Sequence, residues 1–296
     1  MKNDDWDVLI DRIETGACTP FLGAGACHPY IETGAAIAQK WAHEKAFPLG
    51  DANNLGRVAQ YMALNLDGEL KGDPRIPKQK MVDYLKRCRR PPFDDPKDLH
   101  ATLATLPVPI YVTTNYDPFL TNALKHARRD VHRDFCRWNK WLEKRHKSER
   151  YSPTVAAPMV FHLHGHDEVV DSLVLTEDDY IDFIVNVSQN SNLIPPVVQE
   201  AMTDNMLVFL GYSLSDWNFR VLFRTMQNYL EQSTRRGHVA VQLPPDGLPD
   251  PARAIKFFEK YFGGEEITLF WGTCEEFAKT LREKRSARLG ATATAP

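Results

Sequence analysis

Short runs of hydrophobic residues recur along the chain, separated by longer segments in which the hydrophobic residues have helical spacing. Six of these runs are too short for helices and are rich in β-branched or aromatic residues; they read TPFLGAG, PVPIYVTTN, PMVFHLHG, NMLVFLGYS, GHVAVQL and EEITLFWG. Helical spacing is found over Asn54–Asn65, Gln79–Cys88, Asp216–Glu231 and Pro251–Phe262. Strands that are apolar throughout and alternate with helices are typical of a parallel sheet covered on both faces. The pattern therefore predicts an α/β fold with a doubly wound, Rossmann-like parallel sheet.

The same pattern predicts a single domain over residues 1–290. The stretch Leu49–Pro107 is mostly helical, and we expect it to form a helical lobe beside the sheet. Residues 291–296 read ATATAP, have little to bury, and are expected to be a disordered tail.

Composition and charge exclude several classes of protein. The 296 residues are 43% hydrophobic, and the formal net charge of −3 gives no general attraction to nucleic acid or anionic membranes. No apolar run reaches the ~20 residues of a membrane span. The cysteines form no CxxC pair, which fits reduced thiols better than a disulfide framework or a zinc knuckle. We therefore expect a cytoplasmic protein.

Polar residues are concentrated where the predicted strands end, which is where parallel α/β sheets bind ligands. Four of these ends read GAGAC, TTNYD, HLHGHD and GYSLSD. In the first, Gly23, Ala24 and Gly25 form a turn that can bring backbone N–H groups close to a phosphate. His28 stands where the dinucleotide fingerprint has its third glycine. The turn therefore also fits a purely conformational use of glycine.

The second strand end carries Thr114, Asn115 and Asp117. Asn115 and Asp117 can bind an amide, a ribose hydroxyl or a water. Asp117 is equally suited to capping the helix that follows, and Asn115 to forming a local turn.

The third end carries His162, His164 and His166, which alternate along a predicted extended chain and would share one face. Imidazoles on one face can bind zinc, so a metal-dependent hydrolase is one interpretation. The other is a single catalytic imidazole, because a neutral histidine near its ordinary pKa suits a general base at cytoplasmic pH.

The fourth end carries Gly211, Ser213 and Asp216. These residues either line a nucleotide site or form an ordinary junction between a strand and a capped helix.

Together and in this order, the four ends resemble the sirtuin-like domain of bacterial anti-phage defence proteins. That family has a GAG turn, a T-x-N-x-D strand end, an H-G strand end and a later G-Y-S-x-x-D junction. The segment LTEDDY at 175–180 resembles its acidic-aromatic segment, and the resemblance spans about residues 18–285. It implies a hydrolase that cleaves NAD to nicotinamide and ADP-ribose as an antiviral effector. NAD would be its substrate, with no metal.

The resemblance also implies roles for individual residues. Gly23 and Gly25 would make room for the pyrophosphate and ribose of NAD. Asn115 would order the nicotinamide ribose and a water, Asp117 would face the nicotinamide carboxamide, and His164 would be the catalytic histidine. The remaining residues expected to line the NAD site are Ala24, Thr114, Gly211, Ser213 and Asp216.

Two departures separate the chain from protein-deacetylating sirtuins. It lacks the two CxxC pairs that hold their structural zinc, and CHPYIETG stands where they have an Ile-Pro-x-Phe-Arg segment. We therefore expect NAD hydrolysis, with a module that binds NAD or ADP-ribose without turnover as the alternative. Cys27 stands where the family often has serine, and we expect an apolar neighbour of the site rather than a nucleophile.

Residues 125–150 form a basic segment with ten Lys or Arg against four Asp or Glu. Trp138 and Trp141 within it suit a nucleic-acid surface or a protein interface, but we expect a solvated helical excursion whose tryptophans pack on the body. An NAD hydrolase must be gated, because it would otherwise drain its own cell. The resemblance implies homo-oligomers, and a defence partner such as a HerA-like ATPase or a short Argonaute.

Overall fold

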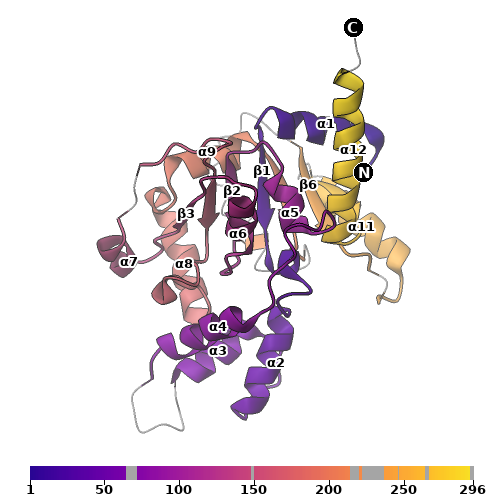
Figure 1. The fold of residues 1–296 in the computed structure, drawn as a ribbon. Coiled ribbons are helices and arrows are strands. Elements are labelled where there is room, and N and C mark those ends of the chain that lie inside the picture. The colour runs from indigo at the N-terminus through magenta and orange to yellow at the C-terminus, as the bar shows by residue number, and fades with distance from the viewer. Residues whose placement is uncertain are drawn as a thin grey trace.

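The computed structural model describes residues 1–64, 72–147, 150–213, 220–221, 237–245, 247–263 and 267–293. Within these residues, seven parallel strands form one sheet in the order β3–β4–β2–β1–β5–β6–β7 (Figure 1). The strands are β1 (Cys18–Leu22), β2 (Ile110–Thr113), β3 (His132–Phe135), β4 (Met159–His162), β5 (Met206–Leu210), β6 (His238–Gln242) and β7 (Ile267–Trp271). The predicted α/β fold is confirmed, and each of the six predicted runs overlaps a strand.

Helices cover both faces of the sheet, because successive strand residues point to opposite sides. Phe21 and Phe209 belong to a core with α8 (Glu177–Gln189), α9 (Pro196–Asp204) and α11 (Pro251–Gly263). The opposite core contains α1 (Asn3–Glu14), α5 (Leu99–Ala104), α6 (Phe119–His126) and α12 (Cys274–Ala293). Burial on both sides explains why the strands read as continuous apolar runs.

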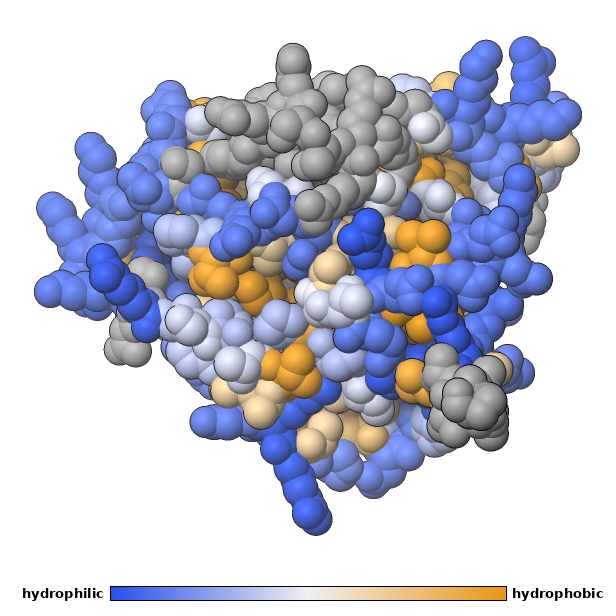
Figure 2. All heavy atoms as spheres, turned by 90° about the horizontal axis from the view of Figure 1, so that it is seen from above, coloured by the Kyte–Doolittle hydropathy of each residue, from blue (hydrophilic) through white to orange (hydrophobic). Residues whose placement is uncertain are grey.

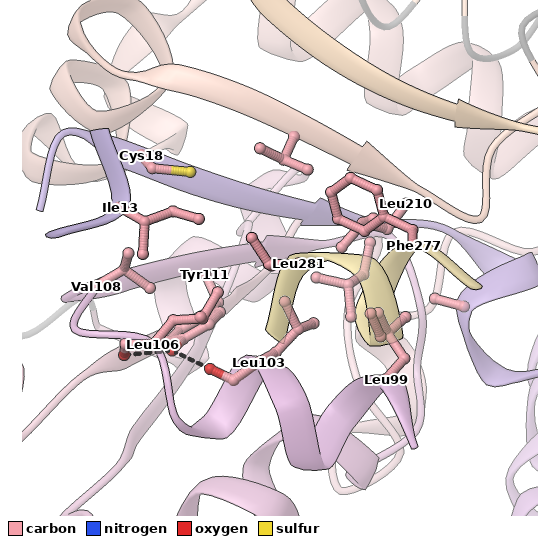
Figure 3. Close-up of a cluster of buried hydrophobic side chains, with 14 of the residues drawn as sticks. Ile13, Cys18, Leu99, Leu103, Leu106, Val108, Tyr111, Leu210, Phe277 and Leu281 are labelled. Atoms are coloured by element: carbon pink, nitrogen blue, oxygen red, sulfur yellow. Dashed lines mark hydrogen bonds between the residues drawn. The ribbon is translucent and has the colours of Figure 1, made fainter. Parts of the chain in front are cut away.

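Figure 3 shows part of this second core, in which a buried hydroxyl is satisfied by the main chain. The Tyr111 hydroxyl donates to the carbonyl oxygens of Leu103 (2.8 Å) and Leu106 (3.4 Å). These bonds attach α5 to the sheet.

The helical lobe lies at the end of the molecule where β1 finishes (Figure 1). Its hydrophobic cluster joins α2 (Gly34–Glu44), α3 (Leu55–Leu64) and α4 (Arg75–Arg87) to Leu173 and Leu175. The lobe was predicted over residues 49–107. The structure adds α2 to it and leaves α5 out, because the apolar side chains of α5 pack in the core with α12. Lys78 of α4 forms a buried ion pair with Asp179 of α8 (2.7 Å), which ties the lobe to the body.

The basic segment contains β3, the strand that the sequence pattern missed, followed by α7 (Lys140–Arg145). The prediction of a helical, solvated excursion is therefore wrong for its first half. Arg133 pairs with Asp167 (2.7 Å) and Asp134 with Arg137 (2.7 Å), so buried charges replace the apolar pattern. Trp138 is buried as expected, whereas 41% of Trp141 is exposed.

The surface seen from above shows a hydrophilic rim and several separate hydrophobic patches (Figure 2). Among the residues that the structure describes, no helix combines the length and apolarity needed to cross a bilayer. The helix predicted over Asp216–Glu231 falls almost entirely outside the described residues.

Candidate functional site

The four strand ends that carry the candidate residues lie on neighbouring strands, β4, β2, β1 and β5. The sheet grows from β1 toward β2 on one side, and β5 pairs with the other side of β1. The winding therefore reverses between β1 and β5. In open parallel sheets, ligands bind outside the strands at such a switch point.

At the switch point, the turn after β1 packs directly on the turn after β5. The Gly23 N–H donates to Leu210 O (2.8 Å), and the Gly25 N–H donates to Gly211 O (2.9 Å). A Cβ on Gly25 would lie 3.0 Å from the Cα and O of Gly211. A Cβ on Gly211, whose φ is +76°, would lie 2.0 Å from Ala26 N. Gly25 and Gly211 thus allow the backbones of the two turns to come into contact. The fold needs this contact whether or not a ligand is bound.

Tyr212 covers one side of the same turn. A Cβ on Gly23 would lie 2.7 Å from the Tyr212 ring, whose hydroxyl donates to Leu22 O (2.9 Å). The same hydroxyl is 2.8 Å from Thr114 Oγ1. A ligand that lies on Gly23 must therefore displace this ring.

Of three other residues predicted to line the site, the structure describes two. Ala24 and Ser213, the next residues along the two turns, are exposed. Asp216 lies outside the described residues.

Asn115 is fixed by protein contacts at three of its polar groups. Its N–H donates to Thr113 Oγ1 (3.0 Å), and its carbonyl oxygen accepts from His162 Nδ1 (2.7 Å). Its Nδ2 donates to Gly23 O (2.9 Å) and to Cys27 Sγ (3.2 Å). Within the described chain, no donor reaches the fourth group, Oδ1. The carboxamide is therefore oriented, with one acceptor left for a ligand.

Cys27, at the end of the short helix η1 (Ala24–Cys27), connects Asn115 to Asp117. The residue is 2% exposed, and its thiol donates to Asp117 Oδ2 (3.1 Å). Burial and the Asp117 carboxylate raise the pKa of the thiol well above its ordinary value, which keeps it neutral. The expectation of an apolar neighbour is therefore corrected to a hydrogen-bonded one.

Asp117 is buried, and the protein uses both of its oxygens. Oδ2 accepts from Cys27, and Oδ1 accepts from the Phe119 N–H at the start of α6 (2.9 Å). This matches the capping interpretation of Asp117. Its contact with the nicotinamide carboxamide stays a prediction.

His162 supports Asn115 from behind. Its Nδ1 donates to Asn115 O, and its Nε2 accepts from Arg133 Nε (3.0 Å), so both ring nitrogens are bonded to protein. Burial and the Arg133 charge lower its pKa well below the ordinary value. The ring is therefore neutral and has no nitrogen left for a ligand.

His164 lies beyond the end of β4, with its ring edge-on to Phe183 (4.8 Å between centroids) and Tyr180 (5.9 Å). Its Nε2 is buried and has no hydrogen-bond partner among the described residues. Burial lowers its pKa to about 3, so the expected pKa near the ordinary value is wrong for this conformation. An unsatisfied buried nitrogen costs free energy, and a hydroxyl of a ligand would satisfy it.

The profile of the family described as "SIR2-like domain" matches residues 109–263, just over half of the chain. This stretch holds β2, β4 and β5 together with Asn115, His164 and Gly211. The chain belongs to the SIR2-like family.

Two curated relatives of this SIR2-like chain are named "NAD(+) hydrolase ThsA". The one from Acinetobacter baumannii (strain 532279) is 24% identical over 241 residues, which are 80% of this chain and 45% of the relative. The one from Bacillus cereus (strain MSX-D12) is 24% identical over 240 residues, which are 79% of this chain and 44% of the relative. The chain thus spans less than half the length of these relatives. A solved chain described under "Structural Basis for the Mechanism and Regulation of Sir2 Enzymes" is 11% identical to this chain, with a TM-score of 0.41. The match covers 98% of this chain and 100% of the solved chain.

The three histidines of the SIR2-like chain do not share one face. Because β4 ends at His162, the alternation does not continue: His164 packs on α8, while His162 faces His166 (5.4 Å between centroids). No group of three or more His, Cys, Asp or Glu side chains in the described residues is arranged to hold a metal ion. With both nitrogens of His162 bonded to protein, a zinc site built from the three rings does not fit this geometry.

Sequence reasoning missed two residues of this SIR2-like site. Tyr212 is a large aromatic next to Gly211, yet nothing local indicates that its ring reaches Gly23. Arg133 lies in the overlooked strand β3, from which it bonds to His162 and donates to Tyr116 O (3.2 Å). Its signal was the cluster of basic residues in that segment, which was interpreted as a solvated surface.

Proposed function

We propose that this protein hydrolyses NAD, releasing nicotinamide and ADP-ribose. The observation that carries the proposal is the oriented carboxamide of Asn115, which has an unused acceptor at the switch point. We assign the second group to His164, because it follows β4, the strand beside β2, and its buried Nε2 has no hydrogen-bond partner among the described residues. The relatives named NAD(+) hydrolase support the same substrate.

The reaction needs few groups. The bond between the ribose and the cationic nicotinamide breaks, and its electron pair goes to the nicotinamide nitrogen, which leaves as a neutral ring. Positive charge develops on the ribose, where a water adds its oxygen and loses a proton. Correct placement of the dinucleotide and the water supplies much of the rate.

Two side chains suit this placement. Asn115 Oδ1 can accept a hydrogen bond from a ribose hydroxyl or from the attacking water, and the buried Nε2 of His164 can bind a second hydroxyl. With a pKa of about 3, His164 is a neutral ring that orients the substrate. Substrate and water around the ring have to raise this pKa before the ring can accept a proton from the water. Tyr212 must move for NAD to lie on Gly23.

Chromatography of nicotinamide released from NAD by the purified protein tests the proposal. Asn115→Ala and His164→Ala should each lower turnover by about tenfold or more, with unchanged circular dichroism. His43→Ala, an exposed position on α2, is the matched control. Full turnover in either site variant would remove that residue from the site.

The same assay separates the alternatives. A wild-type protein that binds NAD but releases no nicotinamide, at any protein concentration and with a HerA-like ATPase or a short Argonaute present, would be a binding module. Turnover that is lost with a chelator and restored by a stoichiometric transition metal would favour the metal-dependent hydrolase.

We further propose that turnover is gated by self-assembly or by a partner in anti-phage defence. The support is physiological, since free turnover would drain the NAD of the cell, and it rests on the resemblance to defence proteins. Light scattering combined with turnover across protein concentrations tests it. A monomer with full turnover at every concentration, and no response to a HerA-like ATPase or a short Argonaute, would contradict it.

A further inference from the structure

The Cys27 thiol forms the middle of a buried chain of hydrogen bonds whose direction is fixed by chemistry. The Asp117 carboxylate can only accept, so the thiol donates to it (3.1 Å). The sulfur lone pairs then face Asn115, which has to offer its Nδ2 (3.2 Å). Gly23 O is also only an acceptor and faces the same Nδ2 (2.9 Å).

We propose that Cys27 and Asp117 are positioning residues that orient the Asn115 carboxamide so that Oδ1 faces the substrate. This inference rests on the proposed hydrolysis of NAD. It places Asp117 behind Asn115, acting through the thiol, instead of in contact with the nicotinamide.

A flipped carboxamide would lose these bonds. Its oxygen would face the Gly23 carbonyl and the sulfur, while its NH₂ would point toward the substrate. The loss of one or two buried hydrogen bonds favours the observed orientation by about 5- to 150-fold. We call the hydrogen bonds from Cys27 to Asp117 and from Asn115 to Cys27 the relay. The relay affects the fraction of the protein that is ready to react, so it should change kcat more than KM.

Three variants test the relay. Cys27→Ala removes the thiol, and Cys27→Ser keeps a donor and an acceptor in its place. Asp117→Asn is informative because the introduced amide oxygen remains with the Phe119 N–H, which turns the NH₂ toward Cys27 and reverses the chain of donors.

Cys27→Ala and Asp117→Asn should each lower kcat by about tenfold, with KM for NAD within about twofold of the wild-type value. Because both act on the same carboxamide, the double variant should be no slower than the slower single variant. Cys27→Ser should recover most of the kcat lost in Cys27→Ala. Multiplying effects in the double variant, or a Cys27→Ser protein as slow as Cys27→Ala, would overturn the relay.

Inhibition by nicotinamide distinguishes the relay from direct contact. If Asp117 acts through Cys27, Asp117→Asn should leave the inhibition constant of nicotinamide unchanged. A clearly weaker inhibition would mean that the carboxylate touches nicotinamide, and would overturn the proposal.

The infrared S–H stretch provides a measurement that does not depend on turnover. Its frequency falls when a thiol donates a stronger hydrogen bond, and subtraction of the Cys27→Ala spectrum isolates the Cys27 band. This band should move to higher frequency in Asp117→Asn; an unmoved band would overturn the relay. A moved band in a protein that releases no nicotinamide would confirm the hydrogen-bond chain and contradict the proposed function.

Discussion

Replacing His166 by asparagine should make the free energy of unfolding fall less between neutral and acidic pH than it does in the wild type. The side chain is 5% exposed, and burial, with a smaller effect of the Arg133 charge, lowers its pKa to about 3. In the unfolded chain a histidine has a pKa of about 6.5. Below that pH the unfolded state binds a proton that the folded state does not bind. The free energy of unfolding therefore falls as the pH drops from about 6.5 toward 3.

The size of the effect follows from these two pKa values. At pH 5 the unfolded imidazole gains RT ln(1 + 10^1.5), about 2 kcal/mol, while the folded one gains almost nothing. At pH 8 the contribution is close to zero. His164 and His238, with pKa values of about 3 and about 4, add effects of the same sign and size. All three therefore make the folded protein less stable as the pH falls from about 6.5 toward 4.

Urea unfolding of the wild type and of His166→Asn at pH 8 and pH 5 measures this contribution. Asparagine keeps an acceptor for the Glu168 N–H, which the ring binds through Nδ1 (3.3 Å). The packing lost against Phe135 (5.1 Å between centroids) is the same at both pH values and cancels in the comparison. The drop in free energy between pH 8 and pH 5 should be about 2 kcal/mol smaller in the variant. Equal drops in the two proteins would refute the reasoning, because the folded ring would then be protonated as easily as the unfolded one.

Two further predictions concern the stability of the fold. Gly25→Ala should destabilise the protein by about 1–3 kcal/mol even without NAD, because the new Cβ would lie 3.0 Å from the Gly211 backbone; unchanged urea unfolding with weakened NAD binding would instead assign this glycine to the ligand alone. Lys78→Met should cost about 3 kcal/mol, the lower end of the range for breaking a buried pair, because Asp179 also accepts from the backbone N–H groups of residues 175 and 176. Thermal and urea unfolding measure this cost, and a change under about 0.5 kcal/mol would show that water replaces the ammonium group.

The strands of this fold could be predicted because the physical cause of the signal is local. Strands β1, β2, β4, β5 and β6 are buried on both faces, and β7 is buried on one face and partly buried on the other, so these six appear as apolar runs in the sequence. Strand β3, at the opposite edge from β7, gives no such signal, because Arg133 and Asp134 form ion pairs with partners outside the strand. Helix α5 reads like the lobe helices, and only its contacts with Tyr111 and α12 show where it packs.

The strand ends that carry the candidate site could be predicted from the sequence, but the hydrogen bonds between its residues could not. Asn115 and His164 follow strands, and their placement at one edge follows from the parallel order. The bond from Asn115 to Cys27 joins residues 88 positions apart, and the bond from Cys27 to Asp117 spans 90 positions. No local pattern carries such pairings. The low pKa of His164 likewise depends on its burial against α8, which the sequence around it does not show.

The backbone contact between Gly25 and Gly211 has a consequence for the evolution of this domain. Selection for folding alone would preserve both glycines, because a Cβ atom on either one would collide with the backbone of the other turn. Under the proposed function, a descendant that no longer hydrolysed NAD would still carry Gly25 and Gly211. Asn115 Oδ1 makes no contact within the described fold, so under the proposed function replacement of Asn115 is the change that would mark a relative as a pseudoenzyme.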